Sequence, residues 1–257
     1  MKKDELRKWR DIFEKQIALD YSCSIDEVRN SENIFTIKQY NEGRRIFKGD
    51  DCLLKVICIN GKLIFSATEQ EILEWCRDTW KDDGGAWFFS FENLRKLENK
   101  LNAIGHRIAD THHFYLPGGI EKEIKLSDEM MEKISFVFYN QELLERFRGD
   151  NRFERALSFI EEAPDVIAVT AEIDGEIIGM AGASMDSPDM WQIGIDVLEK
   201  GKHMGLATIL VTKLKHEIMG KRKLPFYGTS ESHIQSQGVA VKSGFVPAWA
   251  ELYTEKM

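Results

Sequence analysis

The second half of the chain alternates between stretches with a two-residue hydrophobic period and stretches with a helical one. Residues 166–173 are rich in β-branched side chains, and apolar side chains alternate with others over residues 191–197, as is typical of strands. Asp174-Gly175 favours a two-residue hairpin, since such turns need positive φ. The expected strands are residues 166–173, 176–184, 191–197, 224–228 and 245–253, and the expected helices are residues 130–147, 153–160, 208–219 and 232–243.

The first half repeats part of this pattern. Asn60-Gly61 has the hairpin signature, and Gly105, like Gly244, follows a helix that itself follows a short aromatic-rich strand. This predicts a diverged internal repeat. The interval 61–105 spans 44 positions and the interval 175–244 spans 69, so the first copy would lack 25 residues, about one strand and a loop. The expected elements are strands over residues 53–59, 62–66 and 87–91, helices over 68–80 and 93–104, and an extended segment over 106–115.

A run of breakers, Leu116-Pro117-Gly118-Gly119, separates the two patterned regions. It predicts two domains, residues 1–119 and residues 120–257. Hairpins and strand–helix–strand units occur together, so the expected class is α/β with a mixed sheet. Pro247 predicts an edge or a kinked position for the last strand.

The segment Lys-His-Met-Gly-Leu-Ala at residues 202–207 directly follows a strand and opens a helix. A helix N-terminus presents unpaired backbone N–H groups and the positive end of the helix dipole. Glycine lets the chain bend and lets a bulky anion approach the backbone. The segment therefore predicts a pyrophosphate site, with positive character added by Lys202 and His203.

This segment resembles motif A of the GNAT superfamily of N-acetyltransferases, Gln/Arg-x-x-Gly-x-Gly/Ala, which binds the pyrophosphate of acetyl-CoA. Lys202, Gly205 and Ala207 take its three defined positions. Residues 236–245 resemble motif B, and residues 195–197 resemble the family's fourth strand, whose backbone runs beside the pantetheine. The resemblance implies acetyl-CoA as cosubstrate and a coenzyme site made of Ile195, Asp196, Val197, Lys202, His203, Met204, Gly205, Leu206, Ala207, Thr208, His233 and Ser236.

The resemblance covers roughly residues 121–253 and implies the GNAT (acyl-CoA N-acyltransferase) fold for them. Residues 120–257 would be the acetyltransferase domain. Residues 1–119 would be a degenerate GNAT-like or accessory domain, so that the chain holds two GNAT-like units, an arrangement known from tandem members of the superfamily.

Three positions depart from the family pattern. Lys202 stands for Gln/Arg, and His233 stands where motif B usually has Asn. Many members carry a general-acid tyrosine four residues before the Gly-Phe pair, and here that position is Ala240. The resemblance thus leaves the proton donor to the departing thiolate unassigned.

The implied reaction is direct attack of a neutral amine on the thioester, which needs a base and an acid. Asp196 and Glu172 are candidate bases on strands, and His233 is a candidate acid or base. Solvated strand carboxylates and a surface cap are the alternative interpretations of these three residues. Further candidate acids are Tyr227, Ser236 and Tyr253.

Composition narrows the range of partners. A formal net charge of -8 argues against a nucleic-acid binder and is compatible with a cationic amine as acceptor. The four cysteines lack metal-ligand spacing, and the adjacent His112 and His113 would point to opposite faces of a strand, so no metal is predicted. Neither an apolar targeting region nor a membrane-spanning stretch is evident, which predicts a cytoplasmic protein without a membrane partner.

Together these patterns predict an N-acetyltransferase that moves an acetyl group from acetyl-CoA to a primary amine of a small molecule. Two alternatives stay open. The acceptor could be a protein amine, or the protein could be a non-catalytic acyl-CoA sensor, for which Ala240 is the motive. A homodimer also stays open.

Overall fold

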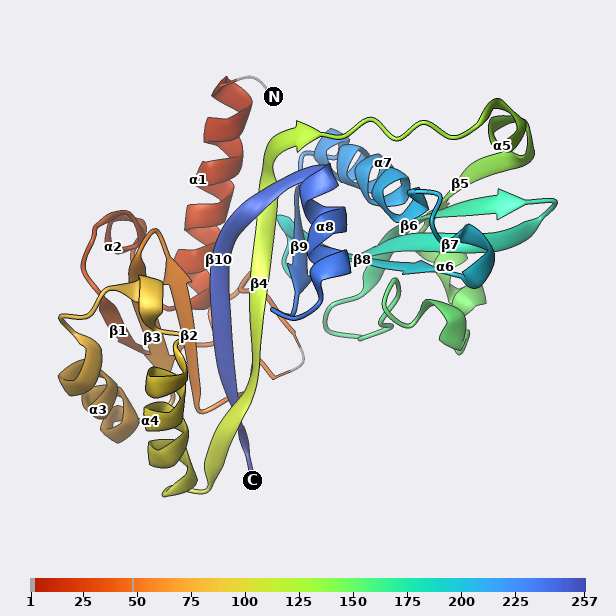
Figure 1. The fold of residues 1–257 in the computed structure, drawn as a ribbon. Helices are drawn as coiled ribbons and strands as arrows, with labels where there is room; N and C mark the ends of the chain where they lie inside the picture. Colours follow the sequence, from red (N-terminus) through yellow and green to blue (C-terminus); the bar gives the residue numbers. More distant parts are fainter. Residues whose placement is uncertain (1–2, 48) are drawn as a thin grey trace. The chain divides into compact units, whose positions relative to one another are not determined.

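The structure is a computed structural model that describes residues 3–47 and 49–257. These residues form two compact units. The C-terminal unit is Tyr115–Val246, and the N-terminal unit comprises the described residues before it together with Pro247–Met257. Both units are mixed α/β, which confirms the predicted fold class (Figure 1). Among the residues described, no helix combines the length and apolar character that a membrane crossing requires.

The N-terminal unit holds strands in the hydrogen-bond order β1-β3-β2-β10-β4, and α3 and α4 pack on β2 and β3 through one apolar core (Figure 1). Asn60 and Gly61 have φ of 51° and 80°, which confirms the predicted hairpin between β2 and β3. Its elements are α1 (Lys3–Asp20), α2 (Ile25–Arg29), β1 (Ile34–Ile37), β2 (Leu54–Ile59), β3 (Lys62–Ala67), α3 (Gln70–Trp80), η1 (Gly85–Trp87), α4 (Phe91–Asn102), the first part of β4 (His106–Glu121) and the last part of β10 (Ser243–Lys256).

The strand expected at residues 87–91 is wrong. The chain makes a 3₁₀ turn there, in which the Phe88 N–H donates to the Gly85 carbonyl at 3.1 Å, and α4 begins at Phe91. Gly85 lies so close to β2 that an added Cβ would stand 2.8 Å from Cys58 Sγ. Because Gly85 packs so closely against β2, this segment forms a turn and not a strand. The predicted internal repeat relied in part on this strand, so one of the observations behind it is lost, and the repeat stays a prediction.

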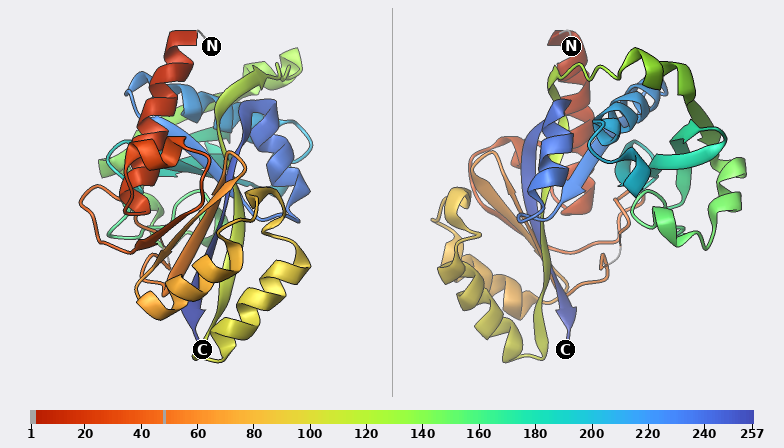
Figure 2. Two further views of the ribbon diagram at one scale, coloured as in Figure 1. Left: turned by 90° about the vertical axis from the view of Figure 1, so that its left-hand side faces the viewer. Right: turned by 45° about the vertical axis from the view of Figure 1, so that its right-hand side comes forward.

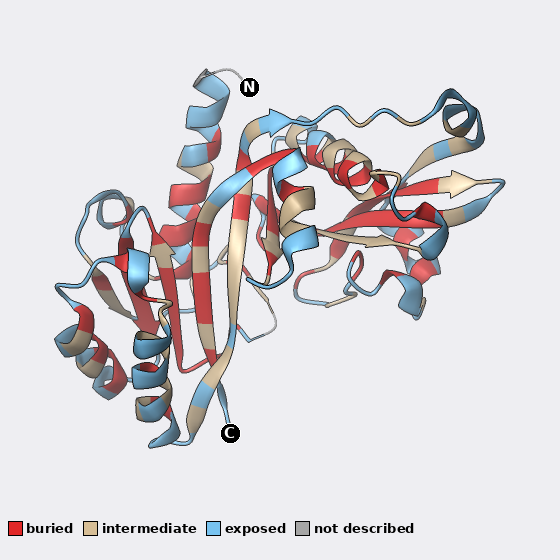
Figure 3. Cartoon of the chain, viewed as in Figure 1, coloured by how far each residue is buried: buried red, intermediate tan, exposed pale blue. Residues whose placement is uncertain are grey.

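The C-terminal unit holds strands in the order β4-β9-β8-β7-β6-β5, with β8 and β9 parallel and β5 to β8 antiparallel. The buried face of α7 packs on this sheet (Figure 3). Asp174 and Gly175 have φ of 51° and 78°, so the predicted hairpin is confirmed. The elements beyond β4 are α5 (Asp128–Lys133), β5 (Ile134–Asn140), α6 (Gln141–Leu144), η2 (Glu145–Phe147), η3 (Asn151–Phe153), β6 (Asp165–Ile173), β7 (Glu176–Ser184), β8 (Met190–Val197), η4 (Glu199–Gly201), α7 (Leu206–Gly220), β9 (Leu224–Thr229) and α8 (Ile234–Lys242).

Two expected helices of this unit are wrong. Residues 134–140, expected inside a helix, form β5, which pairs with β6 from Ile134 opposite Ile173 to Asn140 opposite Ile167. Their β-branched and aromatic side chains suit a half-buried strand, and pairing with β6 overrides the helical spacing. Residues 153–160 form no helix beyond the end of η3. The expected strands that became β6, β7, β8 and β9 are confirmed to within one residue.

The breaker run expected to separate two domains lies inside a strand. Residues 116–119 belong to β4, where Cβ atoms added to Gly118 and Gly119 would stand 3.1 and 3.2 Å from Val246. The glycines therefore allow close packing within the C-terminal unit. The last strand, for which Pro247 predicts an edge or a kinked position, is an inner strand with β2 and β4 as neighbours, and its pairing with β2 begins only at Trp249, beyond the proline.

Candidate functional site

The parallel pair β8–β9 is hydrogen-bonded along only half of β8. Its register runs from Met190 opposite Leu224 to Ile193 opposite Tyr227. Residues 194–197 pair with β7 on one side and, within the described chain, with no residue of β9 on the other. Main-chain groups on that side are thus available to an extended ligand that bonds to a strand edge.

The turn that follows β8 delivers a helix N-terminus next to this open edge. His203 and Gly205 both have left-handed backbone, with φ of 65° and 76°, and α7 begins directly after Gly205. The first hydrogen bond of the helix runs from the Ile209 N–H to the Gly205 carbonyl at 3.2 Å. The N–H groups of the first turn have no helical acceptor, and the helix dipole adds positive potential, so this turn suits an anion.

Gly205 is also a point of close contact. A Cβ at this position would stand 2.6 Å from Ile124 Cγ2, which lies in the coil between β4 and α5. This coil runs along α7 (Figures 1 and 2) and is held at its start by Glu121, whose Oε1 lies 2.6 Å from both Lys215 Nζ and His216 Nε2. Glycine is therefore required here by the backbone conformation and by Ile124 together.

The side chains of the turn contribute less than its backbone. Lys202 and His203 are exposed, and Lys202 Nζ forms an ion pair with Glu199 Oε2 at 2.6 Å. Leu206 and Thr208 are buried and anchor the first turn of α7 in the core. The available polar groups of this segment are thus mainly its backbone N–H groups.

Tyr227 and Ser236 meet where the β8–β9 ladder ends. The Tyr227 Oη and Ser236 Oγ atoms lie 2.9 Å apart, joining β9 to α8, and Tyr227 is buried. Burial raises the pKa of Tyr227 above its ordinary value, although the hydrogen bond to Ser236 opposes this shift. The phenol therefore stays protonated at neutral pH and can donate. Ala240 on α8 is wholly buried in the core and offers no polar group.

Thr229 lies two residues beyond Tyr227 on β9, past the end of the ladder. It is only 5% exposed, and its hydroxyl has no hydrogen-bond partner among the described residues. A buried polar atom without a partner is uncommon and marks a place where a ligand or water can bind. The sequence patterns did not single out Thr229, since nothing local distinguishes it from other strand threonines.

The candidate bases lie on different elements. Asp196 and Glu172 are on the same face of the sheet, on β8 and β6, with β7 between them. Glu172 Oε1 accepts from the hydroxyls of Tyr139 (2.9 Å) and Thr170 (2.6 Å). His233 is exposed at the N-terminus of α8. The structure thus brings Tyr227 and Ser236 together, but not these three residues.

Asp196 is engaged by main-chain groups. Its Oδ2 accepts hydrogen bonds from the N–H groups of Arg155 at 2.8 Å and Ala156 at 3.0 Å. Burial raises the pKa of Asp196 above its ordinary value, and these two N–H groups oppose the rise. The carboxylate therefore already has a structural function.

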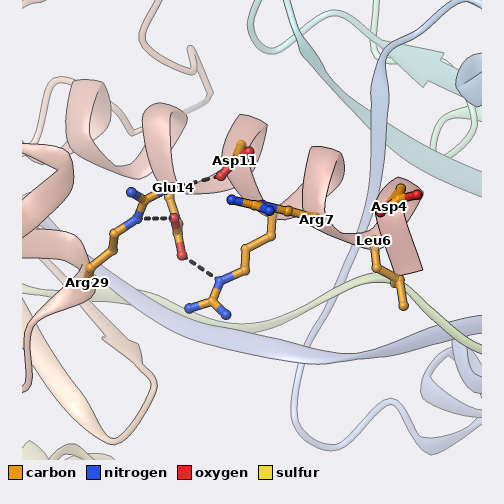
Figure 4. Close-up of a pocket in the computed structure, with 7 residues that line it drawn as sticks. Asp4, Leu6, Arg7, Asp11, Glu14 and Arg29 are labelled. Atoms are coloured by element: carbon orange, nitrogen blue, oxygen red, sulfur yellow. Dashed lines mark hydrogen bonds and ion pairs between the residues drawn. The ribbon is translucent and has the colours of Figure 1, made fainter. Parts of the chain in front are cut away.

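A separate hollow in the N-terminal unit is lined by charged residues of α1 and by Arg29 of α2 (Figure 4). Buried Glu14 bonds to Arg10 at 2.7 Å and to Arg29 at 2.6 Å, and Arg29 also pairs with Asp11 at 3.1 Å. Burial raises the pKa of Glu14, but the two arginines outweigh this effect and hold the pKa below its ordinary value. These charges stabilise the packing of α1 on α2, and no predicted site residue lies among them.

The C-terminal unit is thus an α/β domain in which a helix N-terminus lies beside an interrupted parallel strand pair. Residues 128–245 match the acetyltransferase (GNAT) family, and this part of the chain is a domain of that family. A search of curated proteins gives no match.

Several solved structures resemble the chain weakly. A GCN5-related N-acetyltransferase-like protein from Streptococcus suis is 10% identical over 98% of this chain and 99% of its own, with a TM-score of 0.47. A tandem GNAT protein from the clavulanic acid biosynthesis pathway is 14% identical over 60% of this chain and 56% of its own, with a TM-score of 0.43. An aminoglycoside N-acetyltransferase in complex with CoA is 24% identical over 45% of this chain and 89% of its own, with a TM-score of 0.35.

Proposed function

We propose that the protein transfers the acetyl group of acetyl-CoA to a primary amine of a small molecule. The observation that carries this proposal is the end of the β8–β9 ladder at Ile193 and Tyr227, directly before the turn that opens α7. An acyl-CoA has a diphosphate that suits the helix N-terminus and a pantetheine chain whose amides suit a free strand edge. The family match over the same residues supports it.

In this proposal each predicted coenzyme residue has a defined place. Backbone groups of residues 195–197 bond to the pantetheine amides, and backbone N–H groups of residues 202–208 hold the diphosphate. His233, at the N-cap of α8, and Ser236, in its first turn, supply side chains to the same site. The buried Thr229 hydroxyl, which has no hydrogen-bond partner among the described residues, is a further donor or acceptor on β9.

The acid in this proposal is Tyr227. The amine nitrogen forms a bond to the acetyl carbon, the carbon–sulfur bond breaks, and the thiolate takes the proton of the Tyr227 hydroxyl. Ser236, 2.9 Å from that hydroxyl, positions it and can relay a proton to restore it. The proton that the amine loses leaves through water, because Asp196, the candidate base on β8, is bonded to main-chain N–H groups.

Replacing Tyr227 with phenylalanine is expected to lower kcat about tenfold and to leave the KM for acetyl-CoA unchanged. The CoA thiolate is only weakly basic, because its thiol resembles a cysteine thiol with a pKa of about 8.5. It can therefore leave in part without a proton donor, and the expected decrease in kcat is moderate. Release of free thiol from acetyl-CoA measures both constants. Tyr139→Phe removes the hydroxyl of another buried tyrosine, which is bonded to Glu172, and should keep kcat. Equal kcat values for wild type and Tyr227→Phe would exclude Tyr227 as the acid.

Thiol release in the presence of a panel of primary amines tests the function itself. Turnover with small amines is the expected result. Turnover only with protein amines would favour the alternative acceptor, and acetyl-CoA binding without any turnover would favour a sensor. The four cysteines are free thiols, which is compatible with a proposed cytoplasmic location, where thiols stay reduced.

A further inference from the structure

Residues 155–159, called the crossing segment below, run across the sheet of the C-terminal unit on the face opposite α7. A Cβ added to Gly194 would overlap the Arg155 carbonyl, and one added to Gly182 would overlap the Ala156 carbonyl. These two glycines are directly paired between β7 and β8. Glycine in a strand allows another backbone to approach closely, so the crossing segment packs directly on the sheet at these two glycines.

Both ends of the crossing segment are fixed by carboxylates. At its start, Asp196 Oδ2 accepts from the N–H groups of Arg155 and Ala156. At its end, the Phe159 N–H donates to Asp165 Oδ2 at 2.7 Å. Phe159 has a φ of 52°, a conformation that a bulky residue adopts only when its surroundings impose it. Asp165 is buried, and this burial raises its pKa to about 6 against the opposing effect of the N–H groups.

The crossing segment lies next to the proposed reaction centre. Gly194 is the first residue of β8 beyond the ladder with β9. The Tyr227 side chain shares the α7 face with its partner Ile193, whereas the crossing segment covers the other face. In the described part of the chain, no N–H or O–H group donates to the Arg155 or Ala156 carbonyl. The Arg155 carbonyl, over Gly194, is therefore an acceptor held next to the end of the ladder, on the side away from the acid.

We propose that Asp196 and Asp165 are positioning residues that hold the crossing segment as the wall against which the acceptor amine binds. The Arg155 carbonyl accepts an N–H bond from that amine. The amine nitrogen then approaches the acyl carbon from the face of the sheet opposite the Tyr227 side chain. This inference rests on the proposed function, and it replaces the role of base considered for Asp196 with a structural one.

The test compares alanine and asparagine at both carboxylates, with the amine that gives the fastest thiol release. Asp196→Ala and Asp165→Ala are each expected to raise the KM for this amine about tenfold, because a displaced wall misorients the acceptor. Neither should change the Kd of acetyl-CoA. Asp196→Asn should restore most of the loss, because an amide oxygen still accepts N–H bonds. Asp189→Ala, an exposed carboxylate paired with Lys223, is the control and should match wild type.

Hydrogen exchange gives a readout that needs no acceptor. The Arg155 and Ala156 amides should exchange at least about tenfold faster in Asp196→Ala, and the Phe159 amide in Asp165→Ala, because each loses its acceptor. Faster exchange with an unchanged amine KM would show that the crossing segment is not the acceptor wall. A kcat lost equally in Asp196→Asn and Asp196→Ala, with Asp165→Ala normal, would make Asp196 the base. Wild type without turnover on any amine would remove the proposed function, and the acceptor role with it.

Discussion

Replacing Gly205 with alanine is expected to weaken acetyl-CoA binding by at least about 30-fold. A left-handed backbone costs a residue with a Cβ about 1–2 kcal/mol. The new methyl group, 2.6 Å from Ile124 Cγ2, adds about 1–3 kcal/mol of overpacking. Without a ligand, the turn in Gly205→Ala can relax and so avoid the backbone strain and the contact with Ile124. Binding of acetyl-CoA must then restore the strained conformation. A binding free energy weakened by about 2 kcal/mol raises the Kd roughly 30-fold. Titration calorimetry with acetyl-CoA measures the effect.

Gly220→Ala is the matched control, because it adds the same methyl group at the other end of α7, where nothing lies within 4 Å. It should bind acetyl-CoA like wild type. Adding Ile124→Ala to Gly205→Ala should recover part of the affinity, since it relieves the contact but not the backbone strain. Wild-type affinity in Gly205→Ala would show that the diphosphate does not bind at this turn.

Features that depend on neighbouring residues could be predicted from the sequence. Asn60-Gly61 and Asp174-Gly175 specify hairpins because asparagine, aspartate and glycine tolerate positive φ, and both turns form as predicted. The glycine turn before α7 is also a local feature, because the strand, the glycine and the amphipathic segment follow one another in the sequence. Ile124 was not predictable, because it reaches Gly205 from 81 positions earlier in the sequence.

Features that depend on distant partners could not be predicted. The helical spacing of Ile134, Val137 and Phe138 is real, but only β6 decides that this segment becomes a strand. Asp196 was predicted as a base from its place on β8, although its partners lie about 40 residues earlier in a segment expected to be helical. One signal was available, since glycines at positions 182 and 194 in two adjacent strands indicate a close backbone approach.

Segments far apart in the sequence meet in the N-terminal unit, where residues 247–257 belong to the strand between β2 and β4. Glu251 of this strand accepts from Tyr21 Oη at 2.7 Å, from Arg45 Nη2 at 2.9 Å and from Trp249 Nε1 at 3.2 Å. Arg45 is also bonded to buried Asp20. This strand thus contributes buried residues to the core of the unit, so residues 1–119 alone would lack a strand and a buried charge.

Replacing Glu251 with alanine is expected to destabilise the N-terminal unit by about 3–5 kcal/mol, because Arg45, only 3% exposed, loses a buried carboxylate partner. Burial raises the pKa of Glu251, but the Arg45 guanidinium and the Tyr21 hydroxyl outweigh it and hold the pKa below the ordinary 4.5. The stabilisation is therefore complete above pH 4.5 and is lost as the pH falls through the folded-state pKa. The wild-type advantage should be full at pH 7 and shrink below pH 4.5.

Urea unfolding followed by tryptophan fluorescence measures the stability of the N-terminal unit, because five of the six tryptophans belong to it. Glu255→Ala on the same strand removes a carboxylate whose pair with Arg107 is about half exposed, so it should cost no more than about 1 kcal/mol. A Glu251→Ala protein as stable as Glu255→Ala would mean that the buried network adds nothing to this unit. Equal losses at pH 7 and at pH 3 would instead mean that the packing of the side chain matters and its charge does not.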